Sequence, residues 1–360
     1  MGTGKRESNI ELLRILIMMG IVLSHYASHG GSYAMSTGIN EYIAVLLTIG
    51  GKIAVNIFIV ITGYYMIASD FKTMRIVRLE LAVLFYSIVF YLVACFVWHI
   101  DTWNFGSIKA NFFPTLMNIN DAYWFVPCYM ATVLIAPFMN RLVENLSKHQ
   151  YKLLLTVLLL FVSVVPSLLF SKSLYEGNAA VFILLYLIGG YLNKYGENMY
   201  KVKNWKLLAG AVTICVIEVA LIVNIKRNTE SYALYGVSAD MLRQCHYILM
   251  IAIGVLVFIF FKNLHVPYNP AINKVAAGVI GIYLIHDNKY YRLYVWNNIF
   301  HTQDYCNSNW MIVHAAVCGL IVFVVSWLMD FVRRGLFEVP MKKIEGSHLI
   351  ARMDDIFNRE

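Results

Sequence analysis

Long apolar runs recur along the chain from residue 10 to about residue 334, and short polar connections separate them. Ten of these runs are candidate spans, and most approach the ~20 residues that a helix needs to cross the hydrocarbon core of a bilayer, although the sixth is short. They are residues 10–28, 53–70, 76–98, 122–140, 153–170, 179–193, 205–224, 247–261, 276–298 and 310–332. The pattern predicts an all-α, polytopic membrane protein with about ten transmembrane helices.

Two segments depart from this regular pattern. The run 276–298 is interrupted after "GIYLIH" by "DNKYYR", so we expect its outer half to be broken or to line a cavity. The segment "YIAVLLTI" at 42–49 is too short to span, and we expect it to lie at the membrane interface. Because no soluble-looking block interrupts the runs, we expect one membrane domain over residues 1–334 and a cytoplasmic tail over 335–360.

The composition agrees with a membrane protein. Of 360 residues, 59% are hydrophobic and 14% charged, whereas a soluble domain carries about a quarter charged residues. The net charge of +8 does not indicate nucleic-acid binding, because the basic residues lie in short connections between apolar runs. Alternate connections are richer in Lys and Arg, which predicts that both termini face the cytoplasm. The poorer, outer connections are expected to hold Lys52, among other basic residues.

The six cysteines point to no special chemistry. None forms a C-x-x-C pair, and most lie inside apolar runs, where Cys behaves as a small hydrophobe. We therefore expect no metal site. A disulfide between Cys245 and Cys306 is conceivable if both face outward, but we do not expect it.

The first span carries a cation and an imidazole on one stripe. In "RILIMMGIVLSHY", ten residues separate Arg14 from His25. Eleven helical steps of roughly 100° return the chain to about 20° from its starting direction, ~16 Å further along the axis. Either residue alone is typical of a snorkelling cation or a helix–helix hydrogen bond. Their shared stripe favours a functional pair, and Glu11 is positioned one turn before Arg14 to pair with it.

Polar or aromatic residues mark three later spans. Asn56 lies at a depth similar to His25, where Asn more often joins two helices than touches a substrate. Trp124 and Tyr129 open the span 122–140 and are typical either of an interfacial aromatic belt or of a cavity wall. His286 lies in mid-span before a polar stretch, so it either faces protein and water or caps a helix that ends early.

A basic cluster, "DFKTMRIVR", lies on the expected cytoplasmic side. Such clusters usually fix topology or touch anionic lipid. Arg75 and Arg78 are also suited to grip the phosphates of a cytosolic donor, because Arg forms paired hydrogen bonds to phosphate. No Walker A or dinucleotide fingerprint is present, so ATP and NAD are not indicated.

Five of these segments together resemble the acyltransferase family 3 membrane proteins. "IELLRILIMMGIVLSH" is similar to that family's first span, whose signature is Arg, ten residues, then His. "VNIFIVITGYYM" resembles the second span, "RIVR" the cytoplasmic Arg pair, "YWFVPCY" the aromatic motif and "GIYLIH" the late-span motif. Each match is degenerate alone, but the matches occur in family order and cover nearly the whole chain.

The resemblance implies transfer of an acyl group, usually acetyl, from cytosolic acetyl-CoA to a hydroxyl of an extracytoplasmic or lipid-linked glycan. It implies no resident cofactor or metal, no nucleic-acid partner, and a place in the inner membrane of a bacterium. Arg14 and His25 match the family's essential pair. Donor binding is expected of Arg75, Arg78 and Glu11. Substrate binding is expected of Trp124, Tyr129, His286 and Asn56.

Several alternatives stay open on the sequence. Arg14 would hold a donor phosphate, while His25 would either take the acceptor proton or carry the acetyl group covalently. A transporter or flippase would instead use Arg14, His25 and His286 as a proton or substrate path, and would favour internal repeats that we do not find. A lipid-linked glycan polymerase would be expected to carry a long outer loop.

Overall fold

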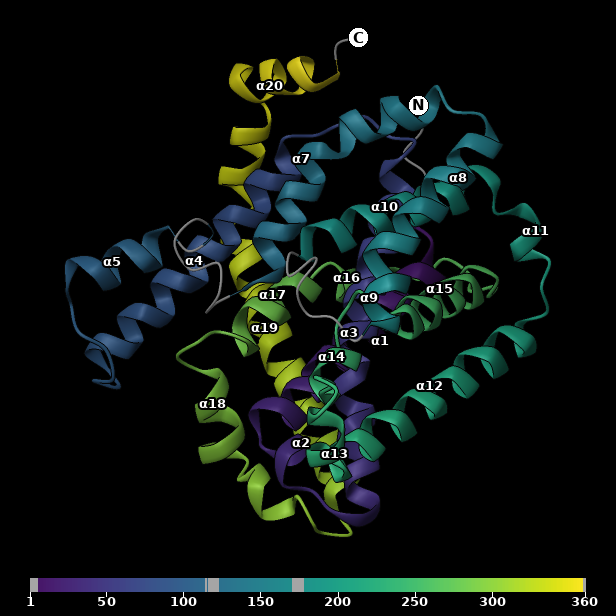
Figure 1. Ribbon diagram of the computed structural model, residues 1–360. Coiled ribbons are helices and arrows are strands. Elements are labelled where there is room, and N and C mark those ends of the chain that lie inside the picture. Colours follow the sequence, from purple (N-terminus) through teal and green to yellow (C-terminus); the bar gives the residue numbers. More distant parts are fainter. Residues whose placement is uncertain (1–5, 114, 116–122, 170–177, 359–360) are drawn as a thin grey trace.

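The computed structural model describes residues 6–113, 115, 123–169 and 178–358 of the chain (Figure 1). These residues form helices and connections, with no strand among them. Seven helical segments are long and apolar enough to cross a membrane, and three shorter apolar segments match the remaining predicted spans. The prediction of an all-α, polytopic membrane protein is therefore confirmed.

Each predicted span overlaps an apolar helix or pair of helices, although several bounds differ. The long segments are α1 (Ser8–His29), α3 (Gly38–Met66), α4 (Met74–Phe96), α7 (Phe125–Glu144), the run α8 (Lys148–Leu159), η1 (Leu160–Val164) and α9 (Val165–Leu168), α12 (Asn204–Arg227) and α19 (Met311–Glu345). The shorter segments are α10 (Asn178–Tyr195), α15 (Ile248–Lys262) and the pair α16 (Pro270–Ala276) and α17 (Val279–His286). The connections hold α2 (Ser32–Met35), α5 (Phe105–Phe112), α11 (Glu197–Tyr200), α13 (Thr229–Ala233), α14 (Ala239–Leu242), α18 (Arg292–Tyr294), η2 (Val295–Ile299) and η3 (Thr302–Tyr305), and α20 (His348–Asn358) follows α19.

Helix α3 differs from its prediction. The segment 42–49 does not lie apart at the interface, because residues 38–66 form one helix of 29 residues. Lys52 consequently lies inside a span and not in a connection. The glycines before it do not end the helix: a Cβ on Gly51 would overlap the side chain of Ser24, so this glycine lets α1 and α3 approach closely. The expected interfacial segment at 42–49 and the expected place of Lys52 in a connection are therefore both wrong, because α3 is continuous.

Helix α3 is the centre of the bundle, packing against α1, α10, α12 and α15. Its contact with α10 is a close backbone crossing. A Cβ on Gly63 would overlap the backbone carbonyl of Tyr186, and a Cβ on Gly189 would overlap that of Val60. Small residues at such crossings let helix backbones touch, which is how spans associate without a hydrophobic driving force. This close packing fixes the position of α3, which forms one side of the site described below.

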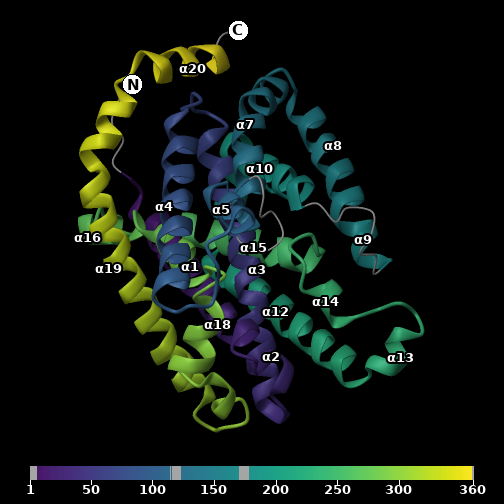
Figure 2. The ribbon, with the colours of Figure 1, turned by 90° about the vertical axis from the view of Figure 1, so that its left-hand side faces the viewer.

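Hydrogen bonds define one end of the bundle, which we call the α20 end. There Asn358 bonds to both backbone groups of Phe71, so α20 is held against the connection between α3 and α4 (Figure 2). Tyr65 at the end of α3 donates to Glu7 before α1, at 3.0 Å. Helix α19 continues without a break through the expected domain boundary at residue 334 before it leads to α20.

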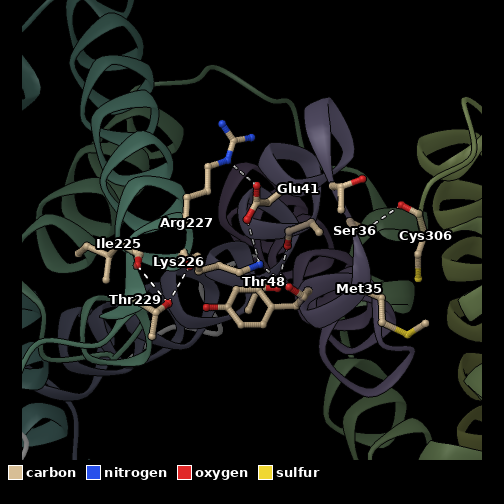
Figure 3. A network of polar contacts seen from close by, with 12 residues as sticks. Met35, Ser36, Glu41, Thr48, Ile225, Lys226, Arg227, Thr229 and Cys306 are labelled. Carbon is tan, nitrogen blue, oxygen red and sulfur yellow. Dashed lines mark hydrogen bonds and ion pairs between the residues drawn. The ribbon is translucent and has the colours of Figure 1, made fainter. Parts of the chain in front are cut away.

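The opposite end, which we call the α2 end, is held by ion pairs and side-chain-to-backbone bonds. Figure 3 shows Glu41 of α3 between two cations of α12, Lys226 at 3.4 Å and Arg227 at 2.9 Å. In the same view Ser36 donates to the carbonyl of Cys306 at 2.8 Å. All six cysteines, Cys306 included, are free thiols. His25 lies toward this end of α1.

Candidate active site

A cavity of about 70 Å³ lies between α1, α3, α17 and the residues that open α7. Helix α1 contributes Met18, Ile21 and His25 to its wall. These positions are three, four and seven residues apart, so they form one stripe of the helix. Arg14 lies one turn before Met18 on that stripe. Arg14 and His25 therefore share one stripe of α1, as predicted, and the His25 end of that stripe lines the cavity.

Two histidines meet at this cavity through a directed hydrogen-bond chain. His286 Nδ1 lies 2.6 Å from the carbonyl oxygen of Ile282, and His286 Nε2 lies 2.9 Å from His25 Nδ1. A carbonyl oxygen only accepts, so Nδ1 of His286 carries the hydrogen and its Nε2, in the neutral ring, accepts. His25 Nδ1 must then donate to it. The remaining nitrogen of His25, Nε2, then carries a lone pair that accepts no hydrogen bond from the described residues.

A buried carboxylate lies beside this pair. Asp287 Oδ1 is 3.6 Å from His25 Nδ1, 3.3 Å from His29 Nε2 and 3.8 Å from Arg292 Nη1. The side chain of Asp287 is 5% exposed, so its charge acts in a medium of low dielectric constant. Placed there, the carboxylate stabilises a positive charge on the His25 ring whenever that ring gains a proton.

The break at the end of α17 puts His286 and Asp287 in place. The helix ends at His286, as the polar stretch after "GIYLIH" predicts. Tyr123 donates to the carbonyl of Leu284 at 2.6 Å, and Asn288 donates to Tyr123 at 2.8 Å. These bonds fix the turn by satisfying backbone and side-chain groups that the helix leaves open. The sequence allowed two interpretations of His286, a residue that faces protein and a residue at an early helix end. The structure shows both features, since His286 contacts His25 and is the last residue of α17.

Three of these side chains also have the arrangement of metal ligands. One ligand atom each from His25, His29 and Asp287 lie within 4.8 Å of one another. Imidazole and carboxylate groups suit Zn²⁺. The expectation that the protein uses no metal stays a prediction.

The sequence-predicted substrate residues take different positions. Trp124 lines the cavity. Tyr129 lies outside the lining and stacks on Phe125, with ring centroids 5.5 Å apart. Asn56 is fully buried and donates to the carbonyl of Cys245 at 3.0 Å, which joins α3 to the segment before α15. A direct substrate contact by Tyr129 or Asn56 stays a prediction.

Sequence reasoning missed Lys52 and His29. Lys52 lines the cavity, and its Nζ lies 4.6 Å from the centre of the Trp124 ring. The sequence pattern places Lys52 in a connection, because it predicts a span that begins at residue 53. His29 follows His25 by four residues, and this spacing places both on one helix face, so it was a usable signal.

The arginines expected to bind the donor lie toward the α20 end and have separate partners. Arg14 Nη1 is 3.6 Å from Glu11 Oε1. Arg75 donates to Ser69 at 3.2 Å, and its Nη1 is buried with no hydrogen-bond partner among the described residues. Arg78 pairs on the surface with Glu345, and about half of each side chain is exposed. Arg75 and Arg78 therefore have different partners in this structure, and donor binding by the two residues stays a prediction.

A second, larger cavity of about 350 Å³ lies at the α20 end. The connection after α3 lines it together with the end of α7 and the last residues of α20. Its polar wall includes Ser69, Asn140 and Lys194. Because Arg75 donates to Ser69, the guanidinium group lies beside this cavity.

The fold and the first cavity define an integral membrane protein with an oriented histidine pair, in which His286 is buried and His25 is partly exposed. The chain belongs to the acyltransferase family, because the sequence model of the acyltransferase domain matches residues 7–330. No curated protein and no solved structure matches the chain. The matched range includes His25 and His286 as well as Arg14, Arg75 and Arg78. The protein is a membrane acyltransferase, which the resemblance in the sequence implied.

Proposed function

We propose that the protein is an O-acetyltransferase that moves an acetyl group from cytosolic acetyl-CoA to a hydroxyl of an extracytoplasmic or lipid-linked glycan. The observation that carries this proposal is the hydrogen-bond chain from Ile282 through His286 to His25. It leaves His25 Nε2 as an oriented base at a cavity between spans. A base so placed is what attack by a hydroxyl on a thioester requires.

In the proposed reaction, the acceptor hydroxyl attacks the thioester carbonyl carbon while its proton passes to His25 Nε2. The C–S bond then breaks, and the CoA thiolate leaves with the proton that the imidazolium returns. Asp287, 3.6 Å from His25 Nδ1, stabilises the imidazolium between these two steps. His286 holds the ring so that Nε2 keeps its direction. His25 thus acts as a base, and the covalent acyl-His route becomes an outcome of the test.

The size of the cavity supports a short acyl group. A volume of about 70 Å³ has room for on the order of five water-sized groups. This is enough for the three heavy atoms of an acetyl group and the attacking hydroxyl. The apolar side chains around it, Val55 and Phe58 among them, suit a methyl group.

The donor is proposed to approach from the α20 end, which we place in the cytoplasm. Arg14 lies on the His25 stripe about three turns nearer that end, where it can bind a donor phosphate or orient the thioester. Glu11 would hold its guanidinium in place, and Arg75 lies beside the larger cavity. With both termini cytoplasmic, the acceptor reaches His25 and Trp124 from outside the inner membrane of a bacterium.

Transfer from labelled acetyl-CoA by the purified protein tests the proposal. In proteoliposomes we expect label to appear in a lipid-linked glycan acceptor, with acetyl-CoA used faster than decanoyl-CoA. Omission of the acceptor should leave no label on the protein. If a histidine becomes labelled without acceptor, His25 carries the acetyl group covalently and does not act only as a base. Uptake of the glycan without any acetylation would contradict the proposal and favour the transporter.

A further inference from the structure

We propose that Lys52 stabilises the negative charge that forms on the acyl carbonyl oxygen during transfer. The inference rests on the proposed acetyl transfer and assigns a catalytic residue to it. It starts from a partly buried cation in the middle of a span, which has no ion-pair partner among the described residues.

Lys52 lies at the midpoint of α3, fourteen residues from each end of the helix. At 1.5 Å per residue, it is about 21 Å from either end. A lysine this deep is unfavourable in a bilayer unless it faces a cavity or a partner, and such residues mark functional sites. Lys52 faces the cavity that also holds His25.

The surroundings of Lys52 differ from those of two other lysines with aromatic neighbours. Lys226 lies over Tyr33 and pairs with Glu41, and Lys262 lies over Tyr64 and pairs with Glu7. Lys52 lies over Trp124, but no carboxylate of the described residues is within ion-pair distance of its Nζ. An aromatic face attracts and holds an ammonium group without neutralising it. The cation is thus positioned and still available to an anion.

The cavity favours one source of that anion. It is too small for a sugar carboxylate together with its ring, and the donor phosphates belong about three turns away, near Arg14. The charge that must arise inside it is the oxyanion of the tetrahedral intermediate. Apolar walls such as Ile280 keep water away, which makes a fixed ammonium more effective than it would be in solvent.

The electron movements are consistent with this role. As the hydroxyl oxygen bonds to the carbonyl carbon, the π pair of the C=O bond moves to oxygen, opposite the Lys52 ammonium. When the pair returns, the C–S bond breaks and the thiolate leaves. Lys52 keeps its proton throughout, and His25 carries the proton that moves.

Three variants test the assignment by kinetics and binding. Lys52→Met removes the charge and keeps the length, and we expect kcat to fall roughly 10²- to 10³-fold, as when an oxyanion donor is lost. The Kd for acetyl-CoA should stay within about twofold of the parent, because the charge forms only in the transition state. Lys52→Arg keeps a cation and should retain activity within about tenfold. Lys226→Met is the matched control, a lysine over an aromatic ring remote from the cavity; Arg227 still pairs with Glu41 in this variant, and kcat should stay within about twofold.

A chemical rescue separates catalysis from structure. Lys52→Cys should be as slow as Lys52→Met, and alkylation with 2-bromoethylamine, which rebuilds an ammonium at that position, should raise its kcat at least about tenfold. The same treatment of Lys52→Met controls for the six native thiols and should change nothing.

Each other outcome overturns the assignment. A folded Lys52→Met with the parent's kcat, or one that loses only acetyl-CoA affinity, excludes an oxyanion role. If Lys52→Met does not fold, an inactive but folded Lys52→Arg excludes it. A parent protein that transfers no acetyl group overturns the proposed function as well, whereas an active parent beside a fully active Lys52→Met overturns this inference alone.

Discussion

The polar residues around His25 and those near the α20 end are organised in opposite ways. His25, His286 and Asp287 are held by one another and by a fixed helix end, and the cavity beside them is small. Arg75 and Arg78 lie three residues apart in α4 and have separate partners: Ser69 is partly buried, and Glu345 lies on the surface. The cavity nearby is five times larger. The first region is preorganised for chemistry, and the second is suited to accept a large, charged ligand.

The contrast follows from the energetics of polar groups inside a membrane. A group in a span must be paired or used, so the residues near His25 are bound into one network. At the helix end Arg78 is exposed, so its ion pair with Glu345 contributes little, and Arg75 is only partly buried. Substitutions should therefore act steeply on turnover in the first region and gently on affinity in the second.

The largest effect is expected at His25. His25→Ala should lower acetyl transfer by about three orders of magnitude, because a positioned base contributes roughly 10²- to 10⁴-fold. His25→Gln keeps hydrogen bonding but cannot take up a proton, so it should be equally inactive. Turnover is measured with labelled acetyl-CoA, and donor binding by equilibrium dialysis should be unchanged.

His149→Ala is the control for this experiment, since His149 is an exposed histidine at the start of α8. It should match the parent in turnover and in detergent stability. An active His25→Gln protein would end the base assignment and leave His25 as a helix–helix contact.

A smaller loss is expected at His286, which touches His25 and not the substrate. His286→Leu removes the acceptor for His25 Nδ1, so the imidazole loses its fixed tautomer, and kcat should fall roughly 10- to 100-fold. His286→Gln supplies both an amide donor for the Ile282 carbonyl and an oxygen acceptor for His25. It should recover most of the activity. Equal activity of the two variants, with equal thermal stability, would show that the hydrogen-bond chain has no positioning role.

Much of this site could be predicted from the sequence because it depends on helical periodicity. Ten residues between Arg14 and His25 fix a shared stripe in any regular helix. The polar stretch after His286 predicts the end of α17, since such residues at membrane depth must turn toward protein or water. Neither inference needs knowledge of a neighbouring helix.

The residues that the sequence did not reveal depend on packing between helices. Lys52 follows two glycines, a pattern that locally favours a break, and only the close contact of Gly51 with Ser24 explains why α3 continues. The pairing of His25 with His286 joins residues 261 positions apart. Similarly, Asn56 is a good candidate by depth, but it donates to the Cys245 carbonyl, a contact that no local pattern indicates.

The smallest effect separates the two arginines at the α20 end. Arg75 has a buried Nη1 without a partner among the described residues and lies beside the larger cavity, so Arg75→Ala should weaken acetyl-CoA binding about tenfold, the size of one charge-assisted hydrogen bond. Arg78→Ala should weaken it less than about threefold, because Arg78 already pairs with Glu345 on the surface.

The double variant should lose affinity most at low salt and show a weaker salt dependence than the parent. Affinities from titration calorimetry at two ionic strengths decide this, with Glu345→Gln as the control that frees Arg78. Unchanged affinity in the double variant would reduce both residues to topology markers.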